Sequence, residues 1–385
     1  MNKFAIVVIG YNRVNSISRL LESLSRADYG TDKVNLIISI DNSGSDNVES
    51  YVKKLQWDFG DKIIKTYPER LGLRKHILTC GDYLKDYDAI AVLEDDIYVS
   101  PNFYNYMKQA VDFYKDEENI AGISLYSHLW SEYNDRPFVP EKSKYDVFFM
   151  QFPQSWGQVW MKKQWFAFRD WYEKNNEPII EQANIPRNVS NWPESSWLKY
   201  HIKYCIENNK YFIYPYVALS TNFTDIGQHA IDRTKTYHVP MVYNIFSDYR
   251  FATFRDNEAV YYDAFFEREG MGKYIGIDDG ELCVDLYGGK NKGLYKKYLL
   301  TMEKCDYKVL QSYALELRPH EVNIIYAVQG NEIFLYDTSI LDKNNNKKDM
   351  EIVKWYYDVR TTNYRQMAKV LYQYVISRIL KKLTR

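Results

Sequence analysis

The chain has 385 residues, of which 50 are Lys or Arg and 51 are Asp or Glu, so its net charge is −1. This balance excludes the strongly basic surface of a typical nucleic-acid-binding protein, and we expect no nucleic-acid partner. Hydrophobic residues make up 46% of the chain and charged residues 26%, which excludes a largely disordered protein. A mean hydropathy of −0.50 and the lack of any run of about twenty apolar residues argue against a membrane-spanning helix.

Runs of apolar, mostly β-branched residues in the first hundred positions predict buried strands at residues 4–10, 34–40, 62–66 and 88–93. Helical spacing occurs between them, at residues 17–24, 48–57 and 71–84. Strands that alternate with helices predict a mostly parallel sheet with helices on both faces. Ligands of such sheets bind at the carboxyl ends of the strands. Asp41 and the run Glu94-Asp95-Asp96 both lie at such ends, so we predict a Rossmann-like α/β fold with its site there.

The pattern changes twice along the rest of the chain. A strand near 121–125, an aromatic segment at 148–171 and a helix at 197–207 continue the first unit, which we place at residues 1–235. Short runs at 282–287, 323–328 and 333–336 predict a smaller β-rich unit at residues 236–345, which would serve the acceptor. The last two runs are expected to form a hairpin across Gln329-Gly330-Asn331. Residues 346–385 are expected to form a basic, helical tail.

Residues 364–385 contain six basic and no acidic residues, and their apolar residues recur near helical spacing. A basic amphipathic helix predicts attachment to an anionic membrane surface. The alternative is a terminal helix that packs on the domain and keeps its basic side in solvent. The apolar run at residues 4–10 is too short for a signal peptide. The four cysteines, Cys80, Cys205, Cys283 and Cys305, form no close pair. We therefore expect a cytoplasmic protein, with a peripheral position on the inner face of the plasma membrane as the further hypothesis.

Glu94-Asp95-Asp96 is the strongest candidate for a functional motif. Three adjacent carboxyl groups at the end of a buried strand repel one another unless a cation or hydroxyl donors compensate their charge. Proteins bind Mg²⁺ in such places through one or two carboxylates together with substrate phosphates, and Mn²⁺ suits the same oxygen ligands. The structural alternative is an acidic turn that stabilises the N-terminus of a helix starting near Pro101.

Residues 4–13 and 38–41, and above all Glu94-Asp95-Asp96 with Pro101-Asn102-Phe103, resemble the nucleotide-sugar half of the GT-A glycosyltransferases. The resemblance is greatest to the inverting N-acetylglucosaminyltransferase I group and its bacterial relatives, and it covers residues 4–230. It implies a GT-A fold with a bound divalent ion, Mn²⁺ or Mg²⁺. It also implies a UDP-sugar as the donor.

The resemblance also implies roles for individual residues. Asp96 matches the residue that holds the metal directly, and Glu94 and Asp95 match positions that contact hydroxyls of the donor's sugar and ribose. Asp41 is similar to the acid that binds the uracil N–H, and Arg13 to the basic residue beside the nucleotide. His76 falls in a helix where the family has a donor-contacting histidine, and a histidine on the helix surface is the alternative.

Two further segments carry aromatic and polar residues. In Ser155-Trp156-Gly157 the indole of Trp156 could stack on the apolar face of a sugar, or it could fill the core between the two halves. The resembled family has a segment with Gly and Trp here, near the donor sugar and the acceptor. His229 follows Gly227 in a polar turn and could complete the metal shell, because imidazole suits Mn²⁺. A solvated loop histidine is the alternative.

An inverting transfer needs one carboxylate to take the proton of the acceptor hydroxyl. In the family an acid pair immediately precedes a tryptophan like Trp197, but here these positions are Ser195 and Ser196. Either Glu194 serves after a small shift, or Asp225 does, or the enzyme is inactive. We expect Glu194 to be the base.

The sequence therefore predicts a metal-dependent, inverting glycosyltransferase of surface-polysaccharide biosynthesis, which moves a sugar from a UDP donor to a glycan or lipid-linked glycan. The alternatives are a non-catalytic carbohydrate-binding or scaffold protein on the same fold, and a nucleotidyltransferase. The loop Gly10-Tyr11-Asn12-Arg13 has one glycine and one arginine, which disfavours the nucleotidyltransferase.

Overall fold

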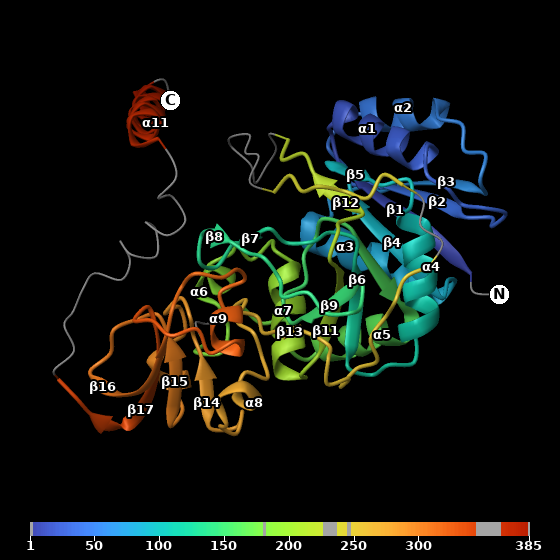
Figure 1. Ribbon diagram of the computed structural model, residues 1–385. Coiled ribbons are helices and arrows are strands. Elements are labelled where there is room, and N and C mark those ends of the chain that lie inside the picture. Colours follow the sequence, from blue (N-terminus) through green and yellow to red (C-terminus); the bar gives the residue numbers. More distant parts are fainter. Residues whose placement is uncertain (1–2, 180–181, 226–236, 245–247, 344–362, 384–385) are drawn as a thin grey trace.

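The computed structural model describes residues 3–179, 182–225, 237–244, 248–343 and 363–383. A mixed sheet of nine strands runs through the larger part of the molecule (Figure 1). Its strands are β1 (Phe4–Gly10), β2 (Asn35–Ile40), β3 (Lys62–Thr66), β4 (Ala89–Glu94), β6 (Ile120–Ser124), β9 (Val147–Met150), β10 (Gln158–Met161), β11 (Tyr211–Pro215) and β13 (Tyr261–Tyr262). Their order across the sheet is β13-β9-β11-β6-β10-β4-β1-β2-β3. The predicted α/β fold is confirmed, as are all four predicted N-terminal strands.

Helices cover both faces of this sheet because successive side chains of a buried strand point to opposite sides. In β1, Ile6 and Val8 pack in one core and Val7 and Ile9 in the other. The first core includes α1 (Val14–Ser25), α2 (Asn47–Lys54) and α4 (Phe103–Tyr114). The second includes α3 (Leu73–Gly81), α5 (Lys162–Tyr172) and α7 (Leu198–Glu207). The apolar run of β1 therefore stabilises both layers at once.

The order of the strands reverses between β1 and β4. From β1 the chain passes to β2 and then to β3, each parallel to its neighbour, and it returns to place β4 on the other side of β1. Loops that leave two such strands in opposite directions create a crevice at their carboxyl ends. The residues that follow β1 and β4 therefore meet at one place.

Short elements complete the rim of this crevice. β5 (Ile97–Val99) pairs with β12 (Ser220–Asn222), and β7 (Trp130–Ser131) pairs with β8 (Arg136–Pro137). The remaining short elements of this part are the 3₁₀ turn η1 (Asp82–Lys85) and α6 (Arg187–Ser190). The pairing of β5 with β12 brings residues 220–225 beside the acidic turn that follows β4.

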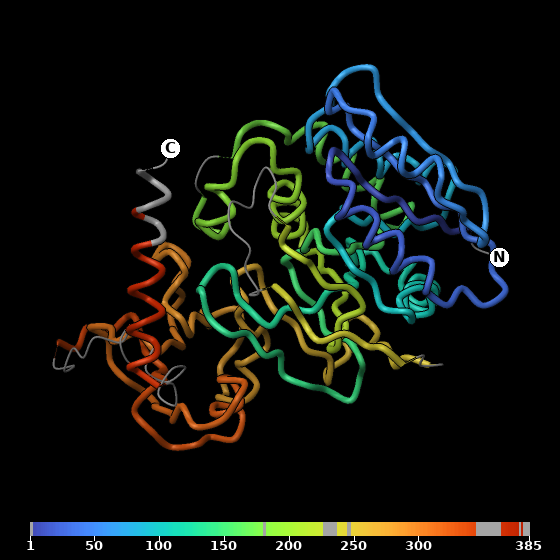
Figure 2. Tube along the Cα trace, turned by 90° about the horizontal axis from the view of Figure 1, so that it is seen from above, coloured from blue at the N-terminus to red at the C-terminus, as the bar shows by residue number. Residues whose placement is uncertain are grey.

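The C-terminal β-rich region is a four-stranded sheet in the order β14-β15-β17-β16. Its elements are α8 (Gly272–Ile275), β14 (Leu282–Val284), η2 (Lys292–Leu294), β15 (Tyr298–Thr301), β16 (Tyr307–Tyr313), α9 (Val322–Ile325) and β17 (Ile333–Leu341). This region and the N-terminal strands lie at opposite ends of the molecule (Figure 2).

The hairpin predicted from residues 323–328 and 333–336 is wrong, because the first of these runs begins in the short helix α9. The side chain of Asn323 accepts hydrogen bonds from the backbone N–H groups of Glu316 and Leu317 and donates to the carbonyl of His320. These local bonds hold the segment in a compact turn, which an extended strand would break. The apolar run that looked like a strand is instead a short buried helix against the C-terminal core.

The main sheet continues past residue 235, because β13 pairs with β9 at its edge. Next to β13, the hydroxyl of Tyr262 donates a hydrogen bond to the carboxylate of Glu321 from α9. Arg268 forms an ion pair of 2.7 Å with Glu141. The hydrogen bond from Tyr262 to Glu321 thus joins the C-terminal region to the main sheet in addition to the chain itself.

The tail forms the helix α11 (Tyr364–Leu383), which confirms the predicted terminal helix. Its residues from 364 to 375 are exposed, with Leu371 at 64% and Tyr374 at 51% relative exposure. The alternative of a helix packed on the domain is not what the structure shows for these residues. Among the helices of the described residues, none has the length and apolar character that crossing a bilayer requires.

Candidate active site

A cavity of about 580 Å³ lies where the strand order reverses. Its lining includes residues 9–13 after β1, Asp41 after β2 and residues 94–96 after β4. Segments from the other half of the domain complete it, with Ser155 and Trp156 before β10 and Ser196 and Trp197 before α7. The acidic motif thus lies in the wall of the cavity, as the strand pattern predicted.

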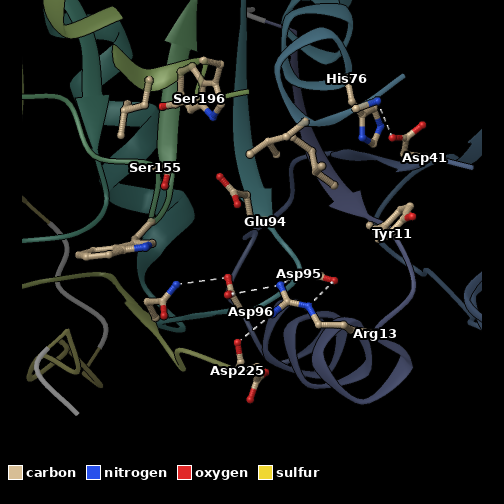
Figure 3. A pocket seen from close by; sticks show the side chains of 18 of the residues that line it. Tyr11, Arg13, Asp41, His76, Glu94, Asp95, Asp96, Ser155, Ser196 and Asp225 are labelled. Carbon is tan, nitrogen blue, oxygen red and sulfur yellow. Dashed lines mark hydrogen bonds and ion pairs between the residues drawn. The ribbon is translucent and has the colours of Figure 1, made fainter. Parts of the chain in front are cut away.

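Arg13 stands between two of the three motif acids (Figure 3). Its Nε lies 3.2 Å from Oδ2 of Asp95, and its Nη2 lies 3.3 Å from Oδ2 of Asp96. Burial raises the pKa of Asp95 to about 6 even though Arg13 opposes the shift, and it raises that of Asp96 as well. Burial, followed by the charges of Asp96 and Asp95, raises the pKa of Glu94 to about 8. The motif therefore carries more negative charge than Arg13 can balance.

The end of β12 and the residue after it hold Asp96 in place. The side-chain amide of Asn222 donates to Oδ1 of Asp96 at 3.2 Å, and the backbone N–H of Phe223 donates to the carbonyl of Asp96 at 2.9 Å. Asp225 follows and is engaged by α1, because it accepts a 2.7 Å hydrogen bond from Ser16 and forms an ion pair with Arg19. His229 lies outside the described residues.

Asp41 and His76 form the side of the cavity near β2. Asp41 is buried and accepts the backbone N–H groups of Leu71 and Gly72 at 2.7 and 2.9 Å. It therefore fixes the loop that leads into α3. His76 is also buried, so the alternative of a surface histidine is excluded, and its Nε2 lies 2.8 Å from the hydroxyl of Ser39. Burial lowers the pKa of His76 to about 4, and the ring is neutral near pH 7.

The opposite side of the cavity is aromatic. Figure 3 shows Tyr11, Asp41 and His76 on one side of Glu94, and Ser155 and Ser196 on the other. The ring of Trp156 lies 4.8 Å from that of Tyr126 and 4.4 Å from that of Tyr237, measured between centroids. Such a wall suits the apolar face of a sugar ring.

The turn after Trp156 depends on Gly157. This residue has φ of +101°, which L residues with a side chain rarely adopt. A Cβ there would lie 2.8 Å from the hydroxyl oxygen of Ser220. Ser220 in turn donates a 2.6 Å hydrogen bond to the carbonyl of Trp156. Glycine therefore allows β12 to approach closely and fixes the position of the indole.

Glu194 is not among the residues that line the cavity. Its carboxylate forms an ion pair with Lys199, accepts a 3.0 Å hydrogen bond from the hydroxyl of Tyr200, and lies 4.0 Å from Arg74. The hydrogen bond from Lys199 lowers the pKa of Glu194. The neighbouring Ser196 does line the cavity.

Glu132 and Tyr237 are among the lining residues that the sequence analysis missed. Glu132 lies in the turn between β7 and β8, and Tyr237 lies in an irregular segment. Neither belongs to a motif or a periodic run, so no local signal marked them. Only the packing of distant segments brings them to the cavity.

The chemistry of these side chains fits a divalent cation. Excess negative charge and raised carboxyl pKa values around Asp96 are what a cation would relieve. In the described part of the chain, no group of three or more His, Cys, Asp or Glu side chains could hold a metal by itself. A hard ion at this place would therefore share its coordination between Asp96 and a bound phosphate, which is usual for Mg²⁺.

Comparison with known proteins agrees with the predicted fold. Residues 5–172 match the family model "Glycosyl transferase family 2". This segment contains β1 to β4, the acidic motif and Trp156, and the α/β fold of the chain is GT-A-like. No curated protein matches the chain.

Among solved structures, the mannosyltransferase PcManGT from Pyrobaculum calidifontis, in complex with GDP-Man and Mn²⁺, is 14% identical with a TM-score of 0.34, over 56% of this chain and 57% of that one. TarS 1–349 from S. aureus, in complex with UDP-GlcNAc, is 15% identical with a TM-score of 0.37, over 59% and 60%. GalNAc-T7 with UDP, GalNAc and Mn²⁺ is 12% identical with a TM-score of 0.37, over 56% and 43%. The chain thus spans less than two thirds of each of these structures. Because all three TM-scores lie below 0.5, these structures add no argument to the match with the family model.

Proposed function

We propose that this chain, whose residues 5–172 match the model of glycosyl transferase family 2, transfers a sugar from a UDP-linked donor to a hydroxyl of a glycan or lipid-linked glycan. The reaction is metal-dependent and inverts the configuration at the anomeric carbon. One observation carries the proposal: the acids after β4, with Arg13 between them, line a cavity of about 580 Å³ at the point where the strand order reverses.

The residues on the two sides of the cavity have different roles in the proposed reaction. Asp96 would hold Mn²⁺ or Mg²⁺, which when bound neutralises the charge that develops on the departing diphosphate. Glu94 and Asp95 accept hydrogen bonds from donor hydroxyls, and Arg13 keeps both aspartates of the motif in place. His76, neutral and bonded to Ser39, contacts the donor near Asp41.

Asp41 can bind the uracil base only through an oxygen lone pair that its backbone donors leave available. Each carboxylate oxygen has two acceptor positions. The backbone N–H groups of Asn42 and Leu71 use both positions of Oδ1, and that of Gly72 uses one of Oδ2, so one position of Oδ2 is left for a ligand. Trp156, on the other side, offers its ring to the transferred sugar or the acceptor.

Neither carboxylate expected as the base is well placed for that role. Glu194 is bound by Lys199 and Tyr200 outside the cavity lining. Although burial opposes it, the bonds from Ser16 and Arg19 lower the pKa of Asp225. A base whose pKa lies far below the working pH takes up a proton poorly. Another group in the cavity therefore accepts the proton.

A carbohydrate-binding protein without activity is the second candidate. The serines at positions 195 and 196, where the resembled family has acids, favour it. Such a protein would keep the aromatic wall and the nucleotide site and would lack turnover. A nucleotidyltransferase is disfavoured, because the loop after β1 has a single glycine to cradle a triphosphate.

Turnover of UDP-sugars separates these candidates. We expect the full chain to release UDP from at least one member of a panel of common UDP-sugars, with Mn²⁺ present and not after treatment with EDTA. Nuclear magnetic resonance of the product with an accepted glycan would show inversion. Binding of UDP without release from any donor would support the carbohydrate-binding protein instead.

The proposal also includes a role in surface-polysaccharide assembly at the inner face of the membrane. It is supported by α11, whose exposed residues include Val370, Leu371 and Tyr374 beside Lys369. An exposed helix with apolar and basic residues is drawn to anionic lipid.

We therefore expect the full chain to sediment with vesicles of phosphatidylglycerol and phosphatidylcholine but not with phosphatidylcholine alone. Deletion of residues 364–385 should leave it in the supernatant. Equal sedimentation of the full and the shortened chain would remove the membrane role of α11 and leave the catalytic proposal intact.

A further inference from the structure

In the part of the chain that the structure describes, six carboxyl groups line the cavity, and five of them already have an assigned role. The six are Asp41, Glu94, Asp95, Asp96, Glu132 and Asp225. Asp41 holds the loop before α3, Asp95 and Asp96 contact Arg13, and Asp225 pairs with Arg19. Glu94 lies two residues before Asp96, the proposed metal ligand, and is assigned to a hydroxyl of the donor. Glu132 is the one that remains.

Glu132 is held on the acceptor side by a chain of buried hydrogen bonds. Gln154 is 2% exposed, and its Oε1 accepts the backbone N–H of Ser155 at 2.8 Å. This bond fixes the orientation of the amide, so its Nε2 points to Glu132 and donates to Oε1 of the carboxylate. Gln158 donates to the carbonyl of Gln154 at 2.8 Å. Since Ser155 and Trp156 form the adjacent cavity wall, this chain ties Glu132 to that wall.

The turn that carries Glu132 is equally fixed. β7 and β8 pair antiparallel on either side of it, and the backbone N–H of Phe138 donates to the carbonyl of Leu129 at 2.9 Å. The side chain of Asn188 donates to the carbonyl of Glu132 at 3.4 Å. Only one carboxylate oxygen of Glu132 has a hydrogen-bond partner among the described residues. The other oxygen is available to a ligand in the cavity.

We infer that Glu132 is the catalytic base, which takes the proton of the acceptor hydroxyl while the acceptor's sugar ring lies against Trp156 and Tyr237. This inference rests on the proposed function. The acceptor O–H bond breaks and its proton passes to the Glu132 carboxylate. The acceptor oxygen forms the new bond to the anomeric carbon, and the bond from that carbon to the diphosphate oxygen breaks, with its electron pair leaving on the diphosphate.

The electrostatic setting agrees with this role. Burial, opposed by the Gln154 hydrogen bond and aided by the charge of Asp135, raises the pKa of Glu132 to about 7. The other titratable groups that face it are Tyr126, Tyr214 and Tyr237, whose pKa values are all raised, so that they stay neutral near pH 7. A base with a pKa near the working pH transfers protons most effectively.

Glu132→Gln tests the inference because the amide keeps the shape and cannot take up a proton. With a UDP-sugar that the wild-type chain turns over, we expect the rate of UDP release to fall by about 10²- to 10⁴-fold. The affinity for UDP with Mn²⁺, measured by calorimetry, should stay within about twofold, because Glu132 lies on the acceptor side. Glu177→Gln, at an exposed position, is the matched control and should keep the wild-type rate.

The pH dependence gives a second, independent readout. The wild-type rate should rise with pH through about 7, since only the deprotonated carboxylate is active. The residual rate of Glu132→Gln should lack this rise. Gln154→Met removes a bond that lowers the pKa of Glu132, so the midpoint should move to higher pH. This variant keeps the test decisive if Glu132→Gln folds poorly.

The possible failures can be told apart. A wild-type rate in Glu132→Gln, or a large loss in Glu194→Gln or Asp225→Asn alone, would overturn the assignment of the base and leave the proposed function standing. If the wild-type chain releases UDP from no donor, the proposed function fails and this inference fails with it.

Discussion

Asp96→Asn is expected to reduce Mn²⁺-dependent release of UDP by about 10³-fold or more. The amide keeps the size of the side chain and its contact with Asn222, but it removes the negative charge that would hold the cation. Electrostatic stabilisation of a leaving group is worth several kcal/mol in a dry site. The rate is measured with the best UDP-sugar of the panel, at saturating Mn²⁺.

The fold should survive this change. Burial raises the pKa of Asp96, so a neutral side chain of the same shape is tolerated there at least as well as the carboxylate. We expect a melting temperature within a few degrees of the wild type. Asp116→Asn, at an exposed position after α4, is the matched control. A rate for Asp96→Asn equal to that of this control would show that the metal is held elsewhere.

Arg13→Gln is expected to lower both stability and turnover. Arg13 contacts Asp95, Asp96 and the backbone carbonyl of Asp225, and its side chain is 25% exposed. Without it the two aspartates repel each other with no cation between them. Loss of a charge-assisted hydrogen bond costs about 1.5–3 kcal/mol, so the free energy of unfolding in urea should fall by about 2 kcal/mol. Turnover should fall by about 10- to 100-fold, because Asp96 loses its support.

Arg26→Gln is the matched control for this experiment. Arg26 follows the same helix α1 and pairs with Glu22, but both side chains are about 60% exposed, and such pairs contribute little. Coupling between Arg13 and Asp95, measured with the double variant Arg13→Gln/Asp95→Asn, should amount to about 1–3 kcal/mol. If Arg13→Gln is as stable as Arg26→Gln, the motif does not depend on a shared cation.

The sequence pattern predicted correctly those elements that depend on residues close together in the chain. The run at residues 4–10 has no polar residue before Gly10, and only a strand buried on both faces satisfies such a run. The same reasoning placed Asp41 and residues 94–96 at strand ends, because parallel strands end at a common edge. The same reasoning wrongly predicted a strand at residues 323–328, because the hydrogen bonds of Asn323 to residues 316–320 outweigh strand propensity there.

The sequence predicted more of the donor half of the candidate site than of the acceptor half, where it named Trp156 but not Glu132 or Tyr237. Arg13, Asp41 and the motif acids lie directly after strands, and His76 lies on the helix that follows Asp41, so their positions follow from the order of the elements. The acceptor half depends on segments far apart in the chain. Gln154 meets Glu132 across 22 residues, and Trp156 meets Tyr237 across 81.

By itself, the sequence determined the alternation of strands and helices and the acidic residues at the carboxyl ends of the strands, whose negative charge a cation would balance. Each of these features is encoded in a short stretch of the chain. Only the tertiary structure decided which carboxylates face the cavity. Glu194 and Glu132 look alike as isolated residues, yet Lys199 and Tyr200 hold one outside while Gln154 presents the other to the acceptor wall. Hydrogen bonds between distant segments set that difference, and no local pattern contains them.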